Sequence, residues 1–437
     1  MGEQPLLRSF FRRLEEFSTL RWTGRVTKVV GHLVESDGPL CSVGEGCAIV
    51  AEDGRTFSGE IVGFRGRTIL SMPLERPTGI RFGDRIVTRG TLPMLRVGPD
   101  MLGRVIDGTG RPIDKLKPYS AREHWPLQGD APLPLAREPI RSPLGCGIRA
   151  IDGMLTCGRG QRVGIFGGSG VGKSTLIGMM TRATSADLTV LALVGERGRE
   201  VREFLEEAIG PEGLQRSVVV VSTSDQSPLL RIRAALAATT VSEYFCAQGK
   251  NVLLVVDSLT RFAMAQREIG LAAGEPPTAK GYTPSVFTLL ARLIERAGNF
   301  GSSSITAFYT VLMEGDDQND PLVDAVRALL DGHVVLDRKL SAQGHYPAIS
   351  VLDSLSRLMP AVCSAEHLDK ARRIRQLLAA YSASEDLIRV GAYQKGADPM
   401  LDRAIVVLPA IQAFLQQRRT DVGPLENTIE ALMALPV

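Results

Sequence analysis

The middle of the chain reads Gly167-Gly168-Ser169-Gly170-Val171-Gly172-Lys173-Ser174-Thr175. This run matches the phosphate-binding pattern G-x-x-x-x-G-K-[ST], and it stands between an apolar, strand-like run at 162–166 and a helical pattern that begins near Lys173. Glycines let consecutive backbone N–H groups turn inward around a polyphosphate, and the helix N-terminus adds partial positive charge. All nine residues are therefore predicted to bind nucleotide phosphates, with Lys173 on the terminal phosphates and the Ser174 hydroxyl on Mg²⁺.

An aspartate ends a second apolar run further along the chain. Residues 251–256 have the composition of a buried strand, and Asp257 follows them directly. Ligands of open α/β sheets bind beyond the carboxyl ends of the strands, so Asp257 is predicted to hold the Mg²⁺ shell from the side opposite Ser174. The alternative is that Asp257 only caps the next helix, as Ser258 also could.

A charged segment follows a third apolar run. Residues 194–200 read Val-Gly-Glu-Arg-Gly-Arg-Glu. Glu196 stands at a predicted strand end, where a carboxylate can orient and polarise the water that attacks a phosphoryl group. Arg197 is predicted to neutralise charge on the γ-phosphate or to orient Glu196. The alternative is a solvated loop without a catalytic role.

The sequence around these motifs predicts three folded parts. From about 161 to 357 buried strands alternate with helical stretches, which predicts an α/β core with a parallel sheet covered on both faces; the strands are 162–166, 189–194, 217–221, 251–256 and 304–310. Residues 22–89 hold short β-rich runs separated by turn signals such as Ser36-Asp37-Gly38-Pro39, which predicts a small antiparallel barrel. A Pro-rich connector joins the two parts, and the chain after about 365 is mostly helical.

Composition excludes several classes of protein. The 437 residues are 44% hydrophobic and 23% charged, as in globular proteins, and the net charge of +3 excludes a strongly cationic nucleic-acid binder. No apolar run reaches the length of a membrane-spanning helix. The six cysteines form no CxxC pair, which excludes a zinc ribbon and a disulfide framework. A soluble, intracellular protein is expected.

The N-terminal segment has its own pattern. Residues 5–20 place apolar side chains, among them Phe10 and Phe11, at helical spacing with charged residues between them. One interpretation is a terminal helix packed on its own domain. The other is a partner-binding or membrane-surface helix, because adjacent exposed phenylalanines are costly in water.

These motifs resemble the catalytic subunits of rotary ATPases and, more narrowly, the flagellum-specific export ATPase and its relatives in virulence type III secretion. The features that carry the narrower resemblance are Ala150-Ile-Asp-Gly-Met-Leu-Thr-Cys157, Phe262-Ala-Met-Ala-Gln266, Gly281-Tyr-Thr-Pro-Ser-Val-Phe287, Glu314-Gly-Asp-Asp-Gln-Asn-Asp-Pro321 and Leu387-Ile-Arg-Val-Gly-Ala-Tyr393. Gln318, Asp320 and the run 324–327 are more similar to the flagellar branch.

The resemblance implies a fold, domain limits and site residues. The fold is a RecA-like phosphate-loop core with an N-terminal β-barrel and a C-terminal helical domain. The implied limits are a partner-binding helix at 1–20, the barrel at 21–90, the ATPase domain at 91–365 and the helical domain at 366–437. Arg357 resembles an arginine finger supplied by the neighbouring subunit, and Arg261 falls near the site.

The same resemblance implies the activity and the partners. The activity is Mg²⁺-dependent ATP hydrolysis by a homo-hexameric ring that energises flagellar or type III protein export, through substrate–chaperone release and unfolding. The implied partners are a regulatory protein at the N-terminal helix, a central stalk protein, the export gate, chaperones and secreted substrates. The implied location is the cytoplasm, with peripheral association at the inner membrane.

Three other functions remain open at this stage. A ring-shaped RNA translocase would need stacking aromatics and a basic groove in residues 22–89, where aromatics are sparse, so no nucleic-acid partner is expected. The catalytic subunit of a proton-driven synthase lacks the export-type motifs quoted above. A non-catalytic scaffold is disfavoured by the joint presence of Lys173, Glu196 and Arg357.

Overall fold

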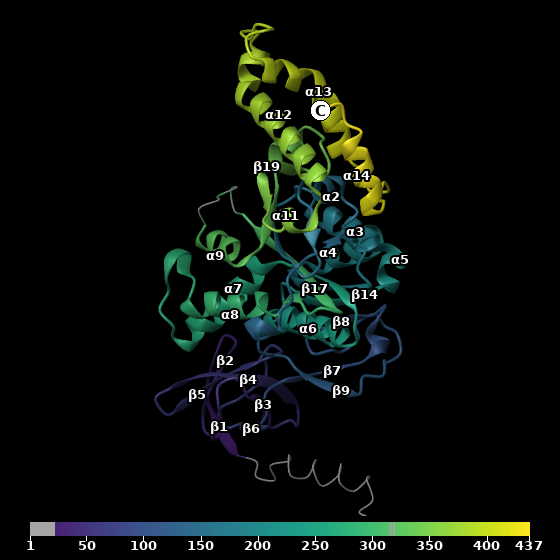
Figure 1. The fold of residues 1–437 in the computed structure, drawn as a ribbon. Helices are drawn as coiled ribbons and strands as arrows, with labels where there is room; N and C mark the ends of the chain where they lie inside the picture. Colours follow the sequence, from purple (N-terminus) through teal and green to yellow (C-terminus); the bar gives the residue numbers. More distant parts are fainter. Residues whose placement is uncertain (1–21, 314, 316, 318–319) are drawn as a thin grey trace, which may run out of the picture.

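The chain is described by a computed structural model that covers residues 22–313, 315, 317 and 320–437. The β-barrel, the α/β domain and the helical domain follow one another along the long axis of the molecule (Figure 1). The predicted fold class is therefore confirmed, while the residue limits proposed for the domains stay predictions. The predicted N-terminal helix at 5–20 and Gln318 lie outside the described residues.

Six antiparallel strands close into the barrel in the order β1-β2-β5-β4-β3-β6. Alternate residues point inward, and Val26, Ile49 and Ile86 form part of its buried core. Ser36 and Asp37 were predicted to form a turn, but they end a strand, since the chain turns only at Gly38, which has a positive φ. The strands are β1 (Thr23–Val30), β2 (Leu33–Asp37), β3 (Gly46–Val50), β4 (Thr56–Arg65), β5 (Thr68–Pro73) and β6 (Arg85–Thr88).

A buried ion pair joins the barrel to the α/β domain. Glu60 on β4 pairs with Arg233 on α6 (Pro228–Ala247), and both side chains are nearly inaccessible. Burial raises the pKa of Glu60, and the Arg233 guanidinium opposes that shift. The Ser227 hydroxyl donates to the Leu74 carbonyl at 2.6 Å and adds a second link at the start of α6.

The central sheet has nine strands, with the path β19-β18-β12-β17-β15-β13-β14-β8 and β16 paired to β17. All five predicted buried strands are present, and they are parallel. Strands β8, β16, β18 and β19 were not predicted from the sequence, and β19 runs antiparallel to β18. The strands are β8 (Val105–Asp107), β12 (Arg162–Gly167), β13 (Leu188–Glu196), β14 (Ser217–Thr223), β15 (Asn251–Asp257), β16 (Gly298–Asn299), β17 (Ser304–Leu312), β18 (Gly332–Leu336) and β19 (Ile349–Ser356).

Two hydrophobic cores cover the two faces of this sheet. Val190 and Ala192 of β13 point into one core, and Leu191 and Leu193 point into the other, as the two-residue period of a strand requires. The first core is shared with α6, α7 (Leu259–Ala273), α8 (Pro284–Ile294) and α9 (Pro321–Leu329). The second is shared with α2 (Arg149–Met154), α3 (Lys173–Ala183), η3 (Phe204–Ile209) and the C-terminal helices.

The C-terminal part is helical, as the sequence predicted. It consists of α11 (Met359–Val362), α12 (Ala365–Arg389), α13 (Pro399–Leu415) and α14 (Leu425–Met433). Side-chain caps begin two of these helices, since Ser364 accepts from the His367 N–H and Asp398 accepts from the Met400 N–H. Among the described residues no helix combines the length and hydropathy that crossing a bilayer requires.

Shorter elements complete the described chain. They are β7 (Met94–Val97), η1 (Pro99–Met101), β9 (Glu123–Pro126), η2 (Pro134–Ala136), β10 (Pro143–Leu144), β11 (Cys157–Gly158), α4 (Gly198–Glu203), α5 (Gly210–Gln215), η4 (Ala279–Gly281) and α10 (Arg338–Ala342). The connector predicted from its prolines contains β7, β9 and η2 and contributes β8 to the edge of the sheet.

Tyr309 in the central strand β17 supports a prediction about stability. Its side chain is fully buried, and its hydroxyl has no hydrogen-bond partner in the part of the chain that the structure describes. Tyr309→Phe keeps the ring and removes a desolvated hydroxyl, so the melting temperature should stay the same or rise. Thr310→Val is the matched control, because the Thr310 hydroxyl donates to Asp257 at 2.7 Å and its loss should cost about 1 kcal/mol. Equal destabilisation by both changes would contradict the assignment of Tyr309 as unpaired.

Candidate functional site

The phosphate loop connects β12 to α3 at the carboxyl edge of the sheet. Gly172 caps α3 with a φ of 91°, a conformation that favours glycine. Gly170 also has a positive φ, and it lines a cavity together with Gly168, Gly172 and Lys173. A Cβ on Gly167 would come within 2.9 Å of the Leu336 Cβ, and glycine at this position lets β12 pack closely against β18. The loop therefore presents a cradle for an anion.

Lys173 and Asp257 form the polar centre of the site. Lys173 Nζ lies 2.6 Å from Asp257 Oδ1, and the side chains are only 13% and 4% exposed. The Thr310 hydroxyl donates to the same oxygen at 2.7 Å. The predicted strand-end position of Asp257 is confirmed, and Ser258 rather than Asp257 caps α7. A carboxylate this deeply buried is stabilised mainly by its two partners.

Glu196 ends β13 on the same side of the sheet. The β13–β14 pairing shifts by one residue at Gly195, which places Glu196 as a strand-end side chain facing the site. Gly195 also gives room to Arg261, since a Cβ there would lie 3.0 Å from the Arg261 Cδ. The Arg261 Nη1 pairs with Glu196 Oε1 at 2.5 Å. Burial raises the pKa of Glu196, and Arg261 opposes the rise.

Arg197 occupies a different position from the one predicted. Its side chain is 80% exposed, and its guanidinium lies 3.6 Å from Glu200. The prediction that Arg197 orients Glu196 does not match this arrangement, because Arg261, four residues after Asp257, holds that carboxylate. A direct role of Arg197 at the γ-phosphate stays a prediction.

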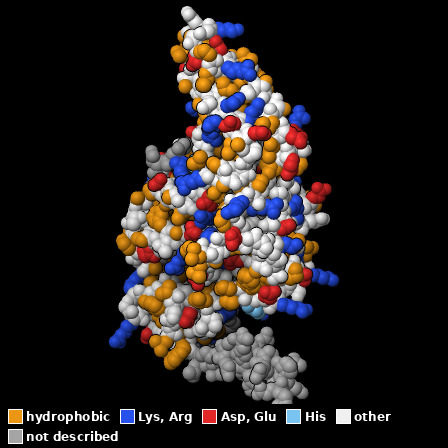
Figure 2. Space-filling model, viewed as in Figure 1, with side chains coloured by type: hydrophobic (Ala, Val, Ile, Leu, Met, Phe, Trp, Pro, Cys, Tyr) orange, Lys and Arg blue, Asp and Glu red, His pale blue; other side chains and the backbone are white. Residues whose placement is uncertain are grey.

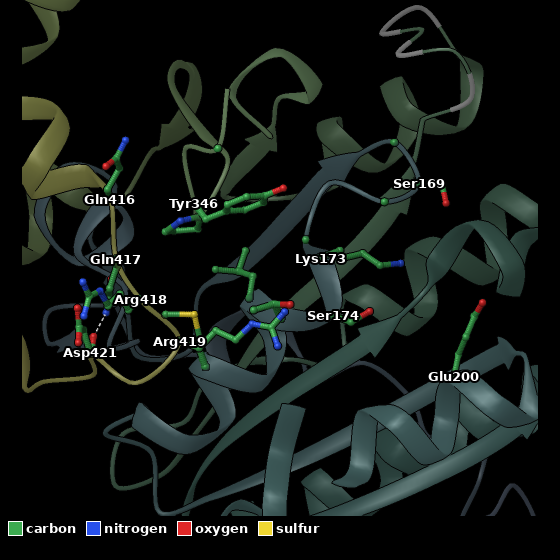
Figure 3. A pocket seen from close by; sticks show the side chains of 18 of the residues that line it. Ser169, Lys173, Ser174, Glu200, Tyr346, Gln416, Gln417, Arg418, Arg419 and Asp421 are labelled. Carbon is green, nitrogen blue, oxygen red and sulfur yellow. Dashed lines mark hydrogen bonds between the residues drawn. The ribbon is translucent and has the colours of Figure 1, made fainter. Parts of the chain in front are cut away.

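One cavity of about 1060 Å³ joins the phosphate loop to the C-terminal part of the chain. In Figure 3, Lys173 and Ser174 lie between Glu200 on one side and Tyr346 with Arg419 on the other. The C-terminal wall consists of Ala413, Gln416, Gln417, Arg418, Arg419 and Asp421. Gln417 fixes this wall, since its backbone N–H donates to the Tyr346 carbonyl at 2.8 Å and its side-chain amide donates to the Gly147 carbonyl at 2.8 Å.

Sequence reasoning missed the part of this cavity that lies beyond the phosphates. The only sequence signal for Tyr346 is an aromatic residue beside Pro347 in a polar loop. Residues 416–421 follow the end of α13 and carry no recognisable sequence pattern. Their participation depends on how the helical domain packs.

Arg357 follows β19 directly and is exposed. Its backbone N–H donates to the Asp331 carbonyl at 3.0 Å. Among the described residues, Arg357 is not part of the wall of the phosphate-loop cavity. The structure therefore brings Lys173, Ser174, Glu196 and Asp257 together within one chain and does not bring Arg357 to them.

A metal ion at this site would depend on the nucleotide as well as on the protein. The described residues hold no cluster of three or more His, Cys, Asp or Glu side chains suited to a metal. Ser174 and Asp257 both line a second cavity beside the first, and they offer a hydroxyl and a carboxylate, the oxygen ligands that Mg²⁺ prefers. Because Mg²⁺ commonly binds through one or two protein groups plus substrate phosphates, the residues present fit it.

Comparison with known proteins agrees with this geometry. The family model for the ATP synthase alpha/beta family nucleotide-binding domain matches residues 147–356, the beta-barrel domain of the same family matches 26–90, and the T3SS EscN ATPase C-terminal domain matches 363–434. The flagellum-specific ATP synthase of Bacillus subtilis is 51% identical over 415 residues, which are 94% of each chain.

Two solved structures are similar over nearly the whole chain. The assembled ATPase EscN from the type III secretion system of enteropathogenic E. coli aligns with a TM-score of 0.88 and 44% identity, covering 94% of this chain and 99% of that chain. EscN in complex with its central stalk EscO aligns with a TM-score of 0.87 at the same identity and coverage.

The fold and the site define a phosphate-loop ATPase with a RecA-like core. Within that class, the chain belongs to the family of the flagellum-specific ATP synthases and type III secretion ATPases.

Proposed function

We propose that this ATPase hydrolyses ATP with Mg²⁺ as a homo-hexameric ring and that the energy drives flagellar or type III protein export. The observation that carries the proposal is the convergence of Lys173, Ser174, Asp257 and Glu196 at two cavities that share Ser174 and Glu196, with Lys173 bonded to Asp257. Release of substrates from chaperones and their unfolding are the proposed uses of the energy. The RNA translocase and the synthase-type subunit are not favoured, because the relatives above are named as a flagellum-specific protein and as a type III secretion ATPase.

The residues of the site divide the chemistry between them. The backbone N–H groups of the loop and the start of α3 bind the phosphates, and Lys173 exchanges its contact with Asp257 for the terminal phosphates. Glu196 orients the attacking water and polarises it. Its raised pKa makes it a stronger base than an ordinary carboxylate, and Arg261 holds it in place. Bound Mg²⁺, held by Ser174 and by the shell around Asp257, would neutralise developing phosphate charge.

We propose that Arg357 acts on the nucleotide of the neighbouring subunit. A second cavity of about 780 Å³ shares Ser174, Glu196 and Asp257 with the site. Its wall also carries Glu200, Glu203, Glu207 and Glu212, so it is rich in carboxylates and complementary to an incoming guanidinium. An exposed Arg357 outside its own site fits a head-to-tail contact in a closed ring.

Tyr346 is proposed to stack on the nucleotide base, because its ring is half-exposed and lines the same cavity as the phosphate loop. Tyr346→Ala should weaken nucleotide binding roughly tenfold to a hundredfold, the effect of losing one stacked base. Turnover at saturating ATP should change little, since the ring does not contact the reacting phosphates. Titration with a fluorescent nucleotide, together with KM and kcat, measures both quantities.

Tyr346→Phe is the control for that prediction. It keeps the ring and removes only the hydroxyl, which lies 3.0 Å from the Ser341 Oγ. Binding close to that of the unmodified chain is expected. Equal loss in both variants would show that the hydroxyl rather than the ring is needed.

The other proposed partners follow the family. EscN has been solved with its central stalk EscO, and a stalk protein is proposed to bind this chain in the same way. The regulatory protein, the export gate, chaperones and secreted substrates are proposed as well, with a cytoplasmic location at the periphery of the inner membrane. Figure 2 shows acidic and basic side chains interspersed on the visible face, which gives no support to a nucleic-acid partner.

The experiment that tests the proposed function couples a mass measurement to an ATPase assay across protein concentration. Specific activity should rise steeply as rings form, and Mg²⁺ should be required. Full activity in a species with the mass of a monomer would contradict the ring mechanism. Absence of ATP turnover at every concentration, in a folded protein with Mg²⁺ present, would contradict the function itself.

A further inference from the structure

His333 occupies the strand that separates the phosphate loop from the strand leading to Arg357. In the sheet, β18 lies between β12, which runs into the loop, and β19, which runs into Arg357. His333 is paired with Gly164 of β12 on one side and with Leu355 of β19 on the other. No part of the mechanism described above uses this imidazole.

The imidazole is bonded to the backbone of β19. His333 Nε2 lies 3.0 Å from the Asp353 carbonyl oxygen, and since a carbonyl can only accept, Nε2 carries the proton and donates. The charged groups that act on the ring are Arg327 from α9, Asp353 from β19 and Arg357 just after β19. The residue of β12 paired with His333 is the uncharged Gly164. Burial, Arg327 and Arg357 lower the pKa of His333, which keeps the ring neutral with Nε2–H as its donor.

The other side of the imidazole contacts the residue that precedes the phosphate loop. The rings of Phe166 and His333 meet edge to face, with centroids 5.9 Å apart and an interplanar angle of 89°. A Cβ on Gly164 would lie within 2.3 Å of the Phe166 ring, so glycine at 164 leaves the space that this ring fills. Arg327 closes the cluster, with its guanidinium 5.3 Å from the Phe166 centroid.

Two further hydrogen bonds connect the region of His333 to β19 and to Arg357. The Val335 N–H donates to the Ser354 hydroxyl at 2.9 Å, next to the His333–Asp353 bond. The Arg357 N–H donates to the Asp331 carbonyl at 3.0 Å, which fixes the point where β19 ends. One imidazole thus contacts both Phe166, next to the loop, and the strand whose end is followed by Arg357.

From these contacts we propose that His333 is a positioning residue that couples the phosphate loop of one subunit to the placement of Arg357 at the next subunit's site. The inference rests on the proposed function, because it requires Arg357 to act between subunits. Among the described residues, His333 lines neither of the two cavities at the phosphate loop. Its effect should therefore appear in the turnover of the neighbour, not in nucleotide binding by its own chain.

The test compares His333→Leu, which removes the donor, with His333→Gln, whose side-chain amide can still donate to the Asp353 carbonyl. His333→Leu should bind nucleotide normally and lose about tenfold in turnover, and His333→Gln should recover most of it. If His333→Leu melts at a lower temperature than His333→Gln, His333→Asn serves as the donor-lacking variant instead. The asparagine amide is too short to reach the Asp353 carbonyl. Equal loss of turnover in the Gln variant and in the donor-lacking variant would overturn the proposal.

Mixed rings then decide where His333 acts. Chains with His333→Leu keep Lys173 and Glu196, so mixing them with Glu196→Gln chains supplies intact Arg357 neighbours. Turnover per His333→Leu site should rise toward the unmodified value. The control partner carries both Glu196→Gln and Arg357→Ala and should give no rise.

The outcomes separate this inference from the ring mechanism. If Glu196→Gln chains rescue Arg357→Ala chains but do not rescue His333→Leu chains, the role of His333 is overturned and the ring mechanism stands. If they rescue neither, in rings shown to exchange subunits, both are overturned.

Discussion

Lys173→Ala is expected to abolish ATP turnover, by about a thousandfold or more, because no other described side chain brings an ammonium group to the phosphate loop. The loss has two causes. The terminal phosphates lose their counter-charge, and Asp257 keeps only the Thr310 hydroxyl as a partner in a buried environment. Turnover is measured by phosphate release and nucleotide binding by titration.

Two controls keep this prediction specific. Lys250→Ala removes an exposed lysine just before β15 and should leave turnover unchanged, because the start of that parallel strand is at the edge of the sheet opposite the loop. A melting curve shows whether the unpaired Asp257 has destabilised the Lys173 variant. Substantial turnover in a folded Lys173→Ala protein would remove the basis for assigning this loop as the catalytic site.

Arg357→Ala and Glu196→Gln should each lose on the order of a thousandfold in turnover while they still bind nucleotide. The amide of Glu196→Gln keeps the size of the carboxylate and loses the charge that polarises water. Mixed together, the two inactive proteins should regain part of the activity. Some interfaces then join an intact Glu196 site to an intact Arg357 from the neighbouring subunit.

The mixing experiment has a matched control. A chain that carries both substitutions has neither an active site nor a finger, and it should not rescue Arg357→Ala. Should the single variants also fail to rescue each other, in rings that demonstrably exchange subunits, Arg357 would serve its own chain. That result would conflict with the exposed position of Arg357 outside its own cavity.

The central strands and the barrel could be predicted because burial leaves a pattern in the sequence. β13 and β15 are covered on both faces, so they read as continuous apolar runs. Strand β19 was missed for the same physical reason, since it is partly exposed and Ser350, Asp353, Ser354 and Ser356 interrupt its apolar residues. Three-residue β8 is too short to leave a period at all.

The phosphate side of the site was predictable and the remainder was not. Parallel strands end at one edge of the sheet, so Asp257 and Glu196 had to lie near the loop once their strands were recognised. Glu196 forms its ion pair with Arg261 instead of the adjacent Arg197. That choice depends on the shift in the β13–β14 register at Gly195, which no local sequence pattern indicates. Tyr346 and Gln417 meet through tertiary packing, 71 positions apart along the chain.

That meeting has a thermodynamic consequence for the helical domain. The same Gln417 that helps to form the wall of the cavity holds the C-terminal segment against Gly147 and Tyr346. Binding in the cavity and attachment of the domain are thus linked equilibria, and linkage is reciprocal. A ligand that stabilises this wall therefore also strengthens the attachment of the helical domain. A force that pulls the domain away from the wall lowers the affinity for that ligand by the same free energy.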